Sequence, residues 1–359
     1  MGKQKKTAKP SRGNTRVFLF IPYKVWWGLG ILAGAALLWQ LAMILSFNLT
    51  PARTNYTFGT SFSKRQAETL GLDWKANFTA LLDDAQVRSF RLMSYWNGIE
   101  YNRGAFDFAS LDWQMDEAAK RGAKVSLAIG LRQPRWPECH APEWTESLET
   151  SAFRQALYAF LEKVVKRYEH HPALENFQLE NEAFAWWFGQ CRFSPDHQQL
   201  AEEYNLVDSW TDKPIWMSLS DQYGIPVYPP IADGLGYSLY TKVYNNIMPG
   251  TYASPSPPVW YHRLRADILR LLYHREMFLH ELQLEPWGPR DIQYLSREEQ
   301  DVTMDAGRIH YNLLLARKIG FDHVYTWGSE WWYWRKVQGD NTIWNAVKSE
   351  IQDSKTRAN

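Results

Sequence analysis

The longest apolar run in the chain extends from Val25 to Phe47, with Gln40 as its only amide and no charged residue. Twenty-three helical residues at ~1.5 Å each reach ~34 Å, which is enough to cross a hydrocarbon core of ~30 Å. Trp26 and Trp27 lie at one end of the run, where interfacial aromatic side chains are expected. The pattern therefore predicts one transmembrane signal-anchor helix over residues 25–47.

The charges before this run predict its orientation. Residues 1–50 contain seven Lys or Arg and no Asp or Glu, and all seven precede the apolar run. The positive-inside rule then makes residues 1–24 a basic cytoplasmic tail and places the rest of the chain outside the cell membrane. A cleavable signal peptide is one alternative, although its apolar region would be ~7–15 residues long. A buried core helix is the other.

After a linker over residues 48–56, buried strand patterns alternate with amphipathic helix patterns. Helices are predicted from Leu111 to Gly122, where glycine ends the first one, and then over four further stretches. Those four are Phe153–Tyr168, Asp196–Trp210, Tyr261–Tyr273 and Arg297–Lys318. Eight strands are predicted, at Phe58–Phe62, Arg88–Met93, Lys124–Ile129, Leu174–Asn181, Pro214–Leu219, Leu235–Leu239, Met277–Glu281 and His323–Trp327.

This alternation implies a parallel sheet, and eight units in ~300 residues favour an α/β fold of the (β/α)₈ TIM-barrel type over residues 57–359. No convincing helix pattern separates Leu219 from Leu235. A doubly wound sheet is the alternative. Such a sheet needs a glycine-rich turn after its first strand, and residues 59–63 do not supply one. In a barrel, the active site lies at the C-terminal ends of the strands.

Charge and cysteine content narrow the function classes. The net charge of +1 is the sum of a +7 tail and a body of 1 − 7 = −6. An acidic body argues against nucleic acid as its partner. Outside the cytosol, Cys139 and Cys191 could pair in a disulfide, and two free thiols are the alternative. The sequence has no Cys/His cluster with zinc spacing, so we expect no metal and no cofactor, and the oligomeric state stays open.

Two predicted strands end in acidic residues. The fourth ends in Glu180-Asn181-Glu182, and the seventh ends in Glu281, with Glu285 four residues further on. Strands four and seven face each other across the mouth of a barrel, so their acids can converge. Paired carboxylates are the chemistry of glycoside cleavage, in which one donates a proton and the other attacks the anomeric carbon or activates water.

These residues resemble those of the clan A retaining β-glycosidases, a superfamily of (β/α)₈ barrels. Asn181-Glu182 resembles the Asn-Glu acid/base motif of the clan, and Glu281 is similar to its nucleophile. Phe90-Arg91-Leu92 and the run from Tyr95 to Asp112 resemble segments of cellulase-like family 5 and family 42 β-galactosidases. The resemblance extends from about residue 57 to 335, but His280 and Ala183 stand where these families often have Thr or Ser and Pro.

The resemblance implies roles for the surrounding residues. Asn181 would bind the hydroxyl next to the anomeric carbon, and Trp327 would form the floor of the subsite. Arg91 and Tyr240 would orient Glu281 and keep it ionised, because a nearby cation favours the charged form of a carboxyl. Trp96, in the resembling run, is predicted to contact substrate as well.

Two assignments have alternatives. Glu180 and Glu182 share strand parity, so both could point into the barrel. Glu182 is favoured as acid/base, and the alternative for the deeper Glu180 is a buried polar network or a substrate contact. Glu285 precedes a proline that enforces extended backbone, and we expect it on the rim as a subsite residue, with the role of nucleophile as its alternative.

Tryptophan is abundant, at 19 residues, and flat aromatic rings suit the apolar faces of sugars. Eight of these residues follow strands three, four, seven and eight, and we expect them to line a carbohydrate groove. They are Trp136, Trp144, Trp186, Trp187, Trp287, Trp331, Trp332 and Trp334. Cys139 and Cys191 follow strands three and four, so a disulfide there could clamp the same rim.

The sequence thus predicts a membrane-anchored, extracytoplasmic glycoside hydrolase that cleaves a β-linked oligo- or polysaccharide by retaining double displacement. The alternatives are a transglycosylase that remodels surface glycans, with the same residues, and a catalytically silent carbohydrate-binding barrel. The sugar, its linkage and the choice between endo and exo action are set by loops that the sequence does not resolve.

Overall fold

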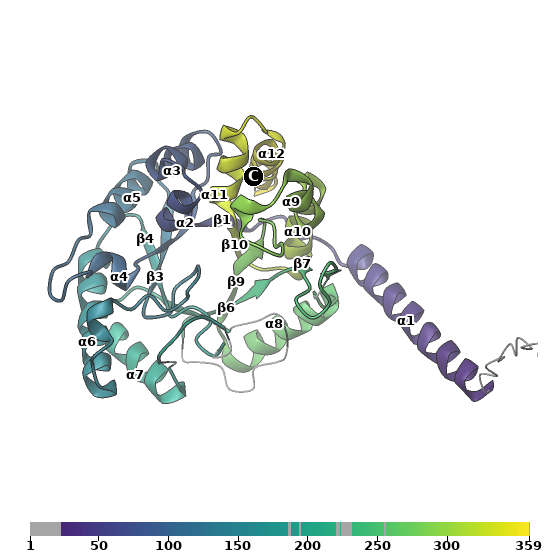
Figure 1. Ribbon diagram of the computed structural model, residues 1–359, viewed down its shortest axis with the longest axis horizontal. Helices are drawn as coiled ribbons and strands as arrows, with labels where there is room; N and C mark the ends of the chain where they lie inside the picture. The colour runs from purple at the N-terminus through teal and green to yellow at the C-terminus, as the bar shows by residue number, and fades with distance from the viewer. Residues whose placement is uncertain are drawn as a thin grey trace, which may run out of the picture. The chain divides into compact units, whose positions relative to one another are not determined.

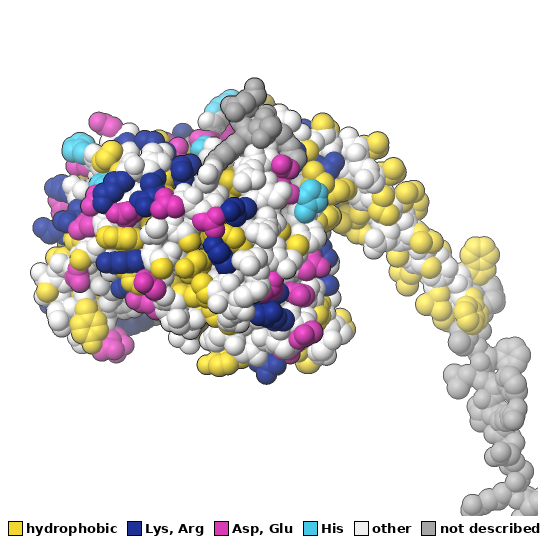
Figure 2. Space-filling view, turned by 90° about the horizontal axis from the view of Figure 1, so that it is seen from above, with side chains coloured by type: hydrophobic (Ala, Val, Ile, Leu, Met, Phe, Trp, Pro, Cys, Tyr) yellow, Lys and Arg dark blue, Asp and Glu magenta, His cyan; other side chains and the backbone are white. Residues whose placement is uncertain are grey.

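The computed structural model describes residues 23–185, 188–193, 195–219, 223, 232–254 and 256–358. The chain divides into two units, Met1–Leu45 and Ser46–Asn359. Helix α1 (Tyr23–Leu49) begins in the first unit. Its segment Val25–Leu49 has a mean hydropathy of 2.0 and is long enough to cross a membrane. Apolar side chains dominate this helix in Figure 2. The predicted basic tail lies outside the described residues, except for its last two.

Eight parallel strands close into a barrel, which confirms the predicted fold (Figure 1). Around the barrel the strands follow the order β1, β2, β3, β4, β5, β6, β9, β10, and β10 pairs again with β1. Their bounds are Thr57–Phe62, Ser89–Met93, Lys124–Ile129, Leu174–Leu179, Ile215–Ser218, Gly234–Leu239, Glu276–Gln283 and His323–Trp327. A short antiparallel pair, β7 (Val243–Tyr244) and β8 (Tyr252–Ala253), was not predicted and follows β6.

Helices surround the strands on the outside of the ring (Figure 1). They are α2 (Lys64–Thr69), α3 (Trp74–Asp83), α4 (Trp96–Ile99), α5 (Ala109–Lys120), α6 (Thr150–Tyr168), α7 (His197–Asp208), α8 (Val259–Tyr273), α9 (Arg297–Thr303), α10 (Ala306–Ile319), α11 (Ser329–Val337) and α12 (Thr342–Ala358), with 3₁₀ turns at Glu143–Thr145 and Ile292–Tyr294.

One predicted helix is wrong in extent. The stretch Arg297–Lys318 forms two helices, because Met304 has an extended backbone and the Asp305 side chain accepts the N–H of Arg308, which begins α10. The interval between β5 and β6, where no helix pattern was found, lies mostly outside the described residues.

Among the described residues, the buried apolar side chains form two clusters. The larger cluster fills the space between strands and helices, and a small one joins Trp216, Phe278 and Tyr325 from β5, β9 and β10. Trp216 lies opposite Gly234 and Phe278 lies opposite Gly236 in the strand register. A Cβ at either glycine would come within 2.6 Å of the aromatic ring, so these positions give the rings their room inside the barrel.

Candidate active site

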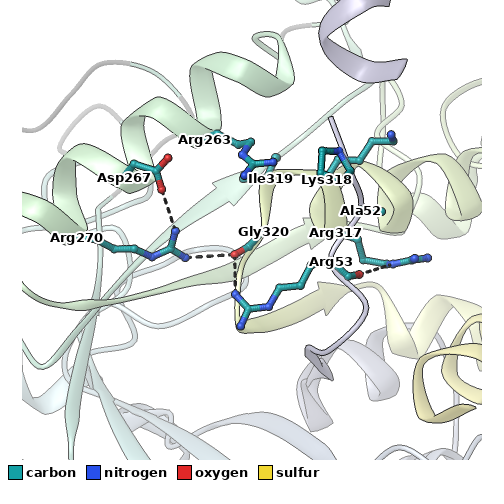
Figure 3. A pocket seen from close by; sticks show the side chains of 10 residues that line it. Ala52, Arg53, Arg263, Asp267, Arg270, Arg317, Lys318, Ile319 and Gly320 are labelled. Atoms are coloured by element: carbon teal, nitrogen blue, oxygen red, sulfur yellow. Dashed lines mark hydrogen bonds and ion pairs between the residues drawn. The ribbon is translucent and has the colours of Figure 1, made fainter. Parts of the chain in front are cut away.

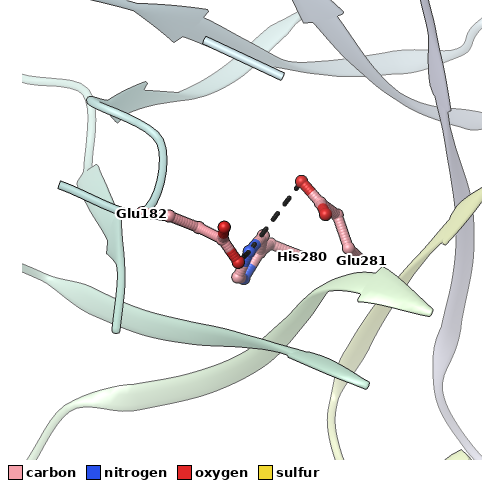
Figure 4. Close-up of side chains that lie close together, drawn as sticks. All are labelled: Glu182, His280 and Glu281. Carbon is pink, nitrogen blue, oxygen red and sulfur yellow. Dashed lines mark ion pairs between the residues drawn. The ribbon is translucent and has the colours of Figure 1, made fainter. Parts of the chain in front are cut away.

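The structure brings Glu182 and Glu281 together at the mouth of the barrel. Glu182 follows β4 and Glu281 lies on β9, and Figure 4 shows both carboxylates beside the ring of His280. One ligand-type atom of each of these three side chains lies within 4.8 Å of the other two. The predicted facing of the fourth and seventh barrel strands therefore produces a close pair of carboxylates.

Glu281 is held by two donors. Arg91, fully buried on β2, donates from Nη1 to Oε1 at 3.0 Å, and the Tyr240 hydroxyl donates to Oε2 at 2.8 Å. Burial, together with the charge of Glu281, raises the pKa of Tyr240 well above its ordinary value. Tyr240 therefore keeps its proton and stays a hydrogen-bond donor, and both carboxylate oxygens of Glu281 are fixed in position.

Asn181 is oriented by the same arginine. Arg91 donates from Nη2 to Asn181 Oδ1 at 2.6 Å, and Arg132 donates to the Asn181 carbonyl at 3.0 Å. The Asn181 amide in turn donates to Glu138 Oε2 at 3.1 Å. One guanidinium thus sets the position of both the predicted nucleophile and the predicted substrate-binding amide.

Glu182 is positioned by two serines at the ends of neighbouring strands. Its backbone N–H donates to Ser218 Oγ at 2.6 Å, and the Ser238 hydroxyl donates to its Oε1 at 3.1 Å. Only 13% of its side chain is exposed. Its φ of +46° lies in the left-handed region, which non-glycine residues rarely adopt and which occurs most often at functional sites.

Glu180 does not join the site. β4 ends at Leu179, and the positive φ of Glu180, +54°, breaks the strand parity that suggested it could point inward beside Glu182. Its carboxylate accepts the N–H groups of Leu131 and Arg132 at 2.6 and 2.7 Å. Burial raises its pKa, so Glu180 forms part of a buried polar network, one of its two expected alternatives.

Glu138 is a third buried carboxyl at the site, and the sequence did not suggest it. Burial, followed by the charges of Glu182 and Glu281, raises its pKa well above the ordinary value. Its surroundings therefore disfavour a third negative charge beside Glu182 and Glu281. In the sequence, the only indication of a role for Glu138 is its position next to Cys139. That position becomes informative only once the pairing of the cysteines is known.

His280 lies between the two carboxylates and is fully buried. Its Nε2 is 3.7 Å from Glu182 Oε1 and 3.9 Å from Glu281 Oε1, and among the described residues neither ring nitrogen has a hydrogen-bond partner. Burial lowers its pKa to about 3, so the ring is neutral. A nitrogen lone pair facing two acidic oxygens would be repelled, so the geometry favours the tautomer with the proton on Nε2.

Glu182, His280 and Glu281 are also the donor types that a divalent metal ion could use. The Arg91 guanidinium, however, already donates to Glu281 Oε1, the oxygen nearest His280. A metal ion at this oxygen would be repelled by the buried cation beside it. The arrangement therefore fits a pair of carboxylates that act directly on a substrate better than a metal site.

Two of the predicted substrate-binding tryptophans have opposite surroundings. Trp96 is fully buried and packs against Trp144, Phe153 and Phe160, so it belongs to the core, and its prediction as a substrate contact is wrong. Its place at the start of α4 turns it inward, where the apolar cluster covers it. Trp136 is 57% exposed and lies 5.9 Å from Phe188, edge to face.

An arginine missing from the sequence prediction connects the loops around the mouth. Arg135, in the loop after β3, binds Glu285 through two hydrogen bonds of 2.6 and 3.1 Å and binds Glu330 at 3.0 Å. Its guanidinium also lies 4.0 Å from the ring centroid of Trp327. Glu285 thus shares one cation with Glu330, and Trp327 has the same cation over its ring.

The predicted tryptophan groove is only partly present. Trp331 and Trp332 lie on α11 and are fully buried, so they are core residues, and Trp186 and Trp187 lie outside the described residues. Trp287 remains partly exposed, 5.2 Å from Tyr240. Cys139 and Cys191 form a disulfide that joins the loops after β3 and β4 at this mouth.

Part of the chain matches a known sequence family. Residues 72–216 match the model of glycoside hydrolase family 42, described as Beta-galactosidase. The match covers less than half of the chain and includes Asn181 and Glu182 but not Glu281. No curated protein matches the chain in sequence.

Solved structures share the barrel. An exo-β-1,4-mannosidase, Op5Man5 from Opitutaceae bacterium strain TAV5, is 13% identical with a TM-score of 0.57 over 86% of this chain and 60% of its own. The cold-adapted β-galactosidase of Rahnella sp. R3 is 12% identical with a TM-score of 0.53, over 86% and 58%. A GH5_18 protein from Streptomyces cattleya, solved with GlcNAc, is 14% identical with a TM-score of 0.51, over 77% and 71%.

This chain therefore spans less than two thirds of the length of the first two structures. At such low identity the structural likeness establishes the fold alone. The resemblance to clan A barrel glycoside hydrolases is confirmed by the partial sequence match and the common barrel, and no single family of the clan is assigned.

Proposed function

We propose that this protein is a retaining β-glycosidase that acts on a β-linked oligo- or polysaccharide outside a membrane. The observation that carries the proposal is the close approach of Glu182 and Glu281, with Arg91 and Tyr240 fixed on Glu281. In retaining enzymes the two carboxyl groups lie ~5–5.5 Å apart, whereas inverting enzymes leave room for a water at ~6.5–9.5 Å.

In the first step, a Glu281 oxygen attacks the anomeric carbon, and the bond from that carbon to the leaving oxygen breaks. Glu182 gives its proton to the leaving oxygen, so the leaving group departs neutral and Glu182 becomes charged. In the second step, Glu182 takes a proton from water, whose oxygen attacks the anomeric carbon. The ester bond to Glu281 then breaks and restores the starting charges.

His280 has a defined part in this exchange. The negative charge moves from Glu281 to Glu182 in the first step and returns in the second, and the Nε2–H group of His280 faces both carboxylates at similar distances. A neutral donor between the two can move a short way and form a hydrogen bond to whichever carboxylate is charged. We assign His280 as a positioning residue on this ground.

The substrate is expected to lie over these residues along the rim. Asn181 would contact the hydroxyl beside the anomeric carbon, and Trp136, Glu285 and Trp327 would line the subsites. Arg135 occupies the space between Glu285 and Trp327, so sugar hydroxyls that reach them would also meet its guanidinium. A transglycosylase would share this arrangement and differ only in using a second sugar instead of water.

The membrane assignment rests on other observations. α1 is long and apolar enough to span, and the disulfide fits an oxidising compartment outside the cytosol. Residues 1–24 would then be cytoplasmic, residues 25–47 would span, and the barrel would be extracytoplasmic. A single cysteine at Lys9, in a chain without Cys139 and Cys191, should resist a membrane-impermeant maleimide in intact cells, and labelling would contradict this orientation.

Full-length protein in detergent, incubated with a panel of aryl β-glycosides, tests the proposed activity. Glu281→Gln should abolish hydrolysis of every substrate that the wild type cleaves, and a 2-fluoro glycoside should label Glu281 in the wild type. Glu276→Gln is the matched control, because Glu276 lies on the same strand but at the opposite end of the barrel.

The outcomes separate the candidate functions. Labelling of Glu285 would refute the assignment of the nucleophile. Glycan binding without turnover would identify a silent binding barrel. Products elongated by an added acceptor sugar would identify a transglycosylase.

A further inference from the structure

A cavity of about 350 Å³ is lined by residues that do not belong to the site at the mouth of the barrel (Figure 3). Its wall is formed by the C-terminal end of α10 and the residue after it, by α8 and by the chain that follows α1. α10 ends just before β10 begins, so the cavity lies toward the N-terminal ends of the strands. We call it the basal cavity, lined by Pro51, Ala52, Arg53, Arg263, Asp267, Arg270, Arg317, Lys318, Ile319 and Gly320.

The basal cavity is strongly basic. Five of its lining residues are Arg or Lys and one is acidic, Asp267. Asp322, just outside the lining, pairs with Arg53 and lies 3.8 Å from Arg270. Counting both carboxylates leaves a surplus of 5 − 2 = 3 positive charges around one cavity.

Two of these cations are buried without a carboxylate. Arg317 and Lys318 are only 7% and 9% exposed, and among the described residues neither forms an ion pair. Arg317 Nε donates to the carbonyl of Arg53 at 3.1 Å, and Lys318 Nζ donates to that of Thr50 at 2.7 Å. Buried charges are normally paired, so these two unpaired cations beside a cavity indicate that an anion completes the site.

The position of the cavity along the chain indicates which anion. The apolar helix ends at Leu49, and Pro51 on the cavity wall is two residues further on. Two residues reach at most ~7 Å, so a spanning helix holds this wall at the membrane surface. α8, which carries Arg263 and Arg270, also exposes Leu264, Leu271 and Leu272. Arginine and exposed leucine on one helix are typical of a helix at the lipid interface.

We infer that the basal cavity binds the phosphate of an anionic phospholipid headgroup at the membrane surface. Guanidinium groups match phosphate oxygens through paired hydrogen bonds, and the exposed leucines of α8 would lie against the acyl chains beside the bound headgroup. The inference rests on the proposed membrane anchoring and is independent of the proposed glycosidase activity. Lipid bound at the base would leave the mouth of the barrel open to the space outside the membrane.

Full-length protein reconstituted in nanodiscs tests the inference. Discs of phosphatidylcholine are compared with discs that also contain phosphatidylglycerol, and the melting temperature of the barrel is measured in each. Phosphatidylglycerol should raise the melting temperature of the wild type, because a ligand that binds only the native state stabilises it. The double variant Arg263→Gln/Arg270→Gln should lose this rise. Both side chains are partly exposed, so the variant is expected to fold.

The matched control is Lys163→Gln/Lys166→Gln, which removes two charges from exposed positions of α6, outside the cavity. It should keep the full rise. Lys318→Gln removes a buried cation of the cavity and should lose the rise as well. An equal rise in wild type and Arg263→Gln/Arg270→Gln, or no rise in the wild type, would overturn the inference.

A second comparison separates the lipid from free phosphate. In detergent without lipid, inorganic phosphate should stabilise the wild type less than phosphatidylglycerol does in nanodiscs. Stabilisation by phosphate with none from the lipid would overturn the assignment to a headgroup. Flotation with phosphatidylcholine vesicles tests the anchoring separately, because protein that stays at the bottom of the gradient lacks a membrane span whatever its cavity binds.

Discussion

Replacing His280 by phenylalanine removes the imidazole N–H group between the two carboxylates and keeps an aromatic ring of similar size. At 3.7 and 3.9 Å, Nε2 is just beyond hydrogen-bond distance of Glu182 and Glu281. A shift of about 1 Å would bring it to ~2.9 Å from the carboxylate that carries the charge. A hydrogen bond to a charged group contributes ~1.5–3 kcal/mol, so its loss should lower kcat/KM by ~10- to 150-fold.

The assay uses two aryl glycosides, one with a good leaving group and one with a poor leaving group, so that each chemical step limits the rate in turn. His280→Phe should lower kcat/KM for the substrate with the poor leaving group. The step that breaks its glycosidic bond limits the rate, and negative charge develops on Glu182 in that step. His280→Gln, which keeps an N–H donor on the side chain, should recover part of the rate. KM for the poor substrate should change little, since the hydrogen bond to Glu182 forms only as negative charge develops on that carboxylate.

His262→Phe is the matched control. His262 on α8 is equally buried, and burial lowers its pKa to about 3 as well, but it lies outside the catalytic cluster. Both variants should lose stability, and only His280→Phe should lose rate. Equal kcat/KM in the two variants would show that His280 only fills space.

The pH dependence provides an independent check. The pKa of His280 is lowered to about 3, so the ring is neutral from pH 5 to 8 and contributes no limb to the rate profile. His280→Phe should therefore keep both limbs of the wild-type profile at lower amplitude. A limb near pH 6 to 7 that disappears in this variant would mean that the imidazole titrates, and the assignment of a neutral donor would fail.

Three further outcomes are expected. Glu203→Gln should melt above the wild type at pH 8 and approach it near pH 4, because burial raises the pKa of Glu203 in the folded state. The stability that this carboxyl contributes is complete below its unfolded pKa of ~4.3 and is lost as pH rises from there through the raised folded pKa. Parallel melting curves would contradict this. Cys139→Ser/Cys191→Ser should lose roughly 4 kcal/mol of unfolding free energy, since the bond closes a loop with a sequence separation of 52, and denaturant titration measures the loss. Trp96→Ala should lower the free energy of unfolding by ~3–5 kcal/mol, because Trp96 is fully buried. Trp136→Ala should raise KM with little change in the melting temperature, because Trp136 is exposed. The opposite pair of results would mean that Trp96 contacts substrate and Trp136 supports the core.

The barrel could be predicted because each buried strand carries its own apolar run between helices, a signal local to the sequence. The helix boundary at Met304–Asp305 could not, because the apolar spacing continues through it and only the capping hydrogen bond of Asp305 reveals the break. Helices α11 and α12 were also missed, since the tryptophans after strand eight were interpreted as loop residues.

The approach of Glu182 and Glu281 was predicted from the ends of two strands, but the surroundings of this pair depend on contacts between loops. Glu138 and Arg135 lie in the loop after β3, and their roles depend on residues of β4, β9 and α11 that are distant in sequence. The parity argument for Glu180 failed because it assumes extended backbone, and the chain turns into positive φ at that residue. The residue types around Glu180 do not indicate this change of backbone conformation.

The charges at the mouth follow from these contacts. Three carboxyl groups, Glu138, Glu182 and Glu281, meet two fully buried cations at the mouth of the barrel: Arg91, which pairs with Glu281, and Arg132, whose charge acts on Glu138. Ionising all three carboxyl groups would leave one negative charge more than these two cations balance, and burial raises the pKa of Glu138 well above its ordinary value. The proposed mechanism needs a proton on Glu182, so that Glu281 is the charged member of the pair and lies opposite Arg91. One negative charge then moves between Glu281 and Glu182 with a neutral imidazole beside both.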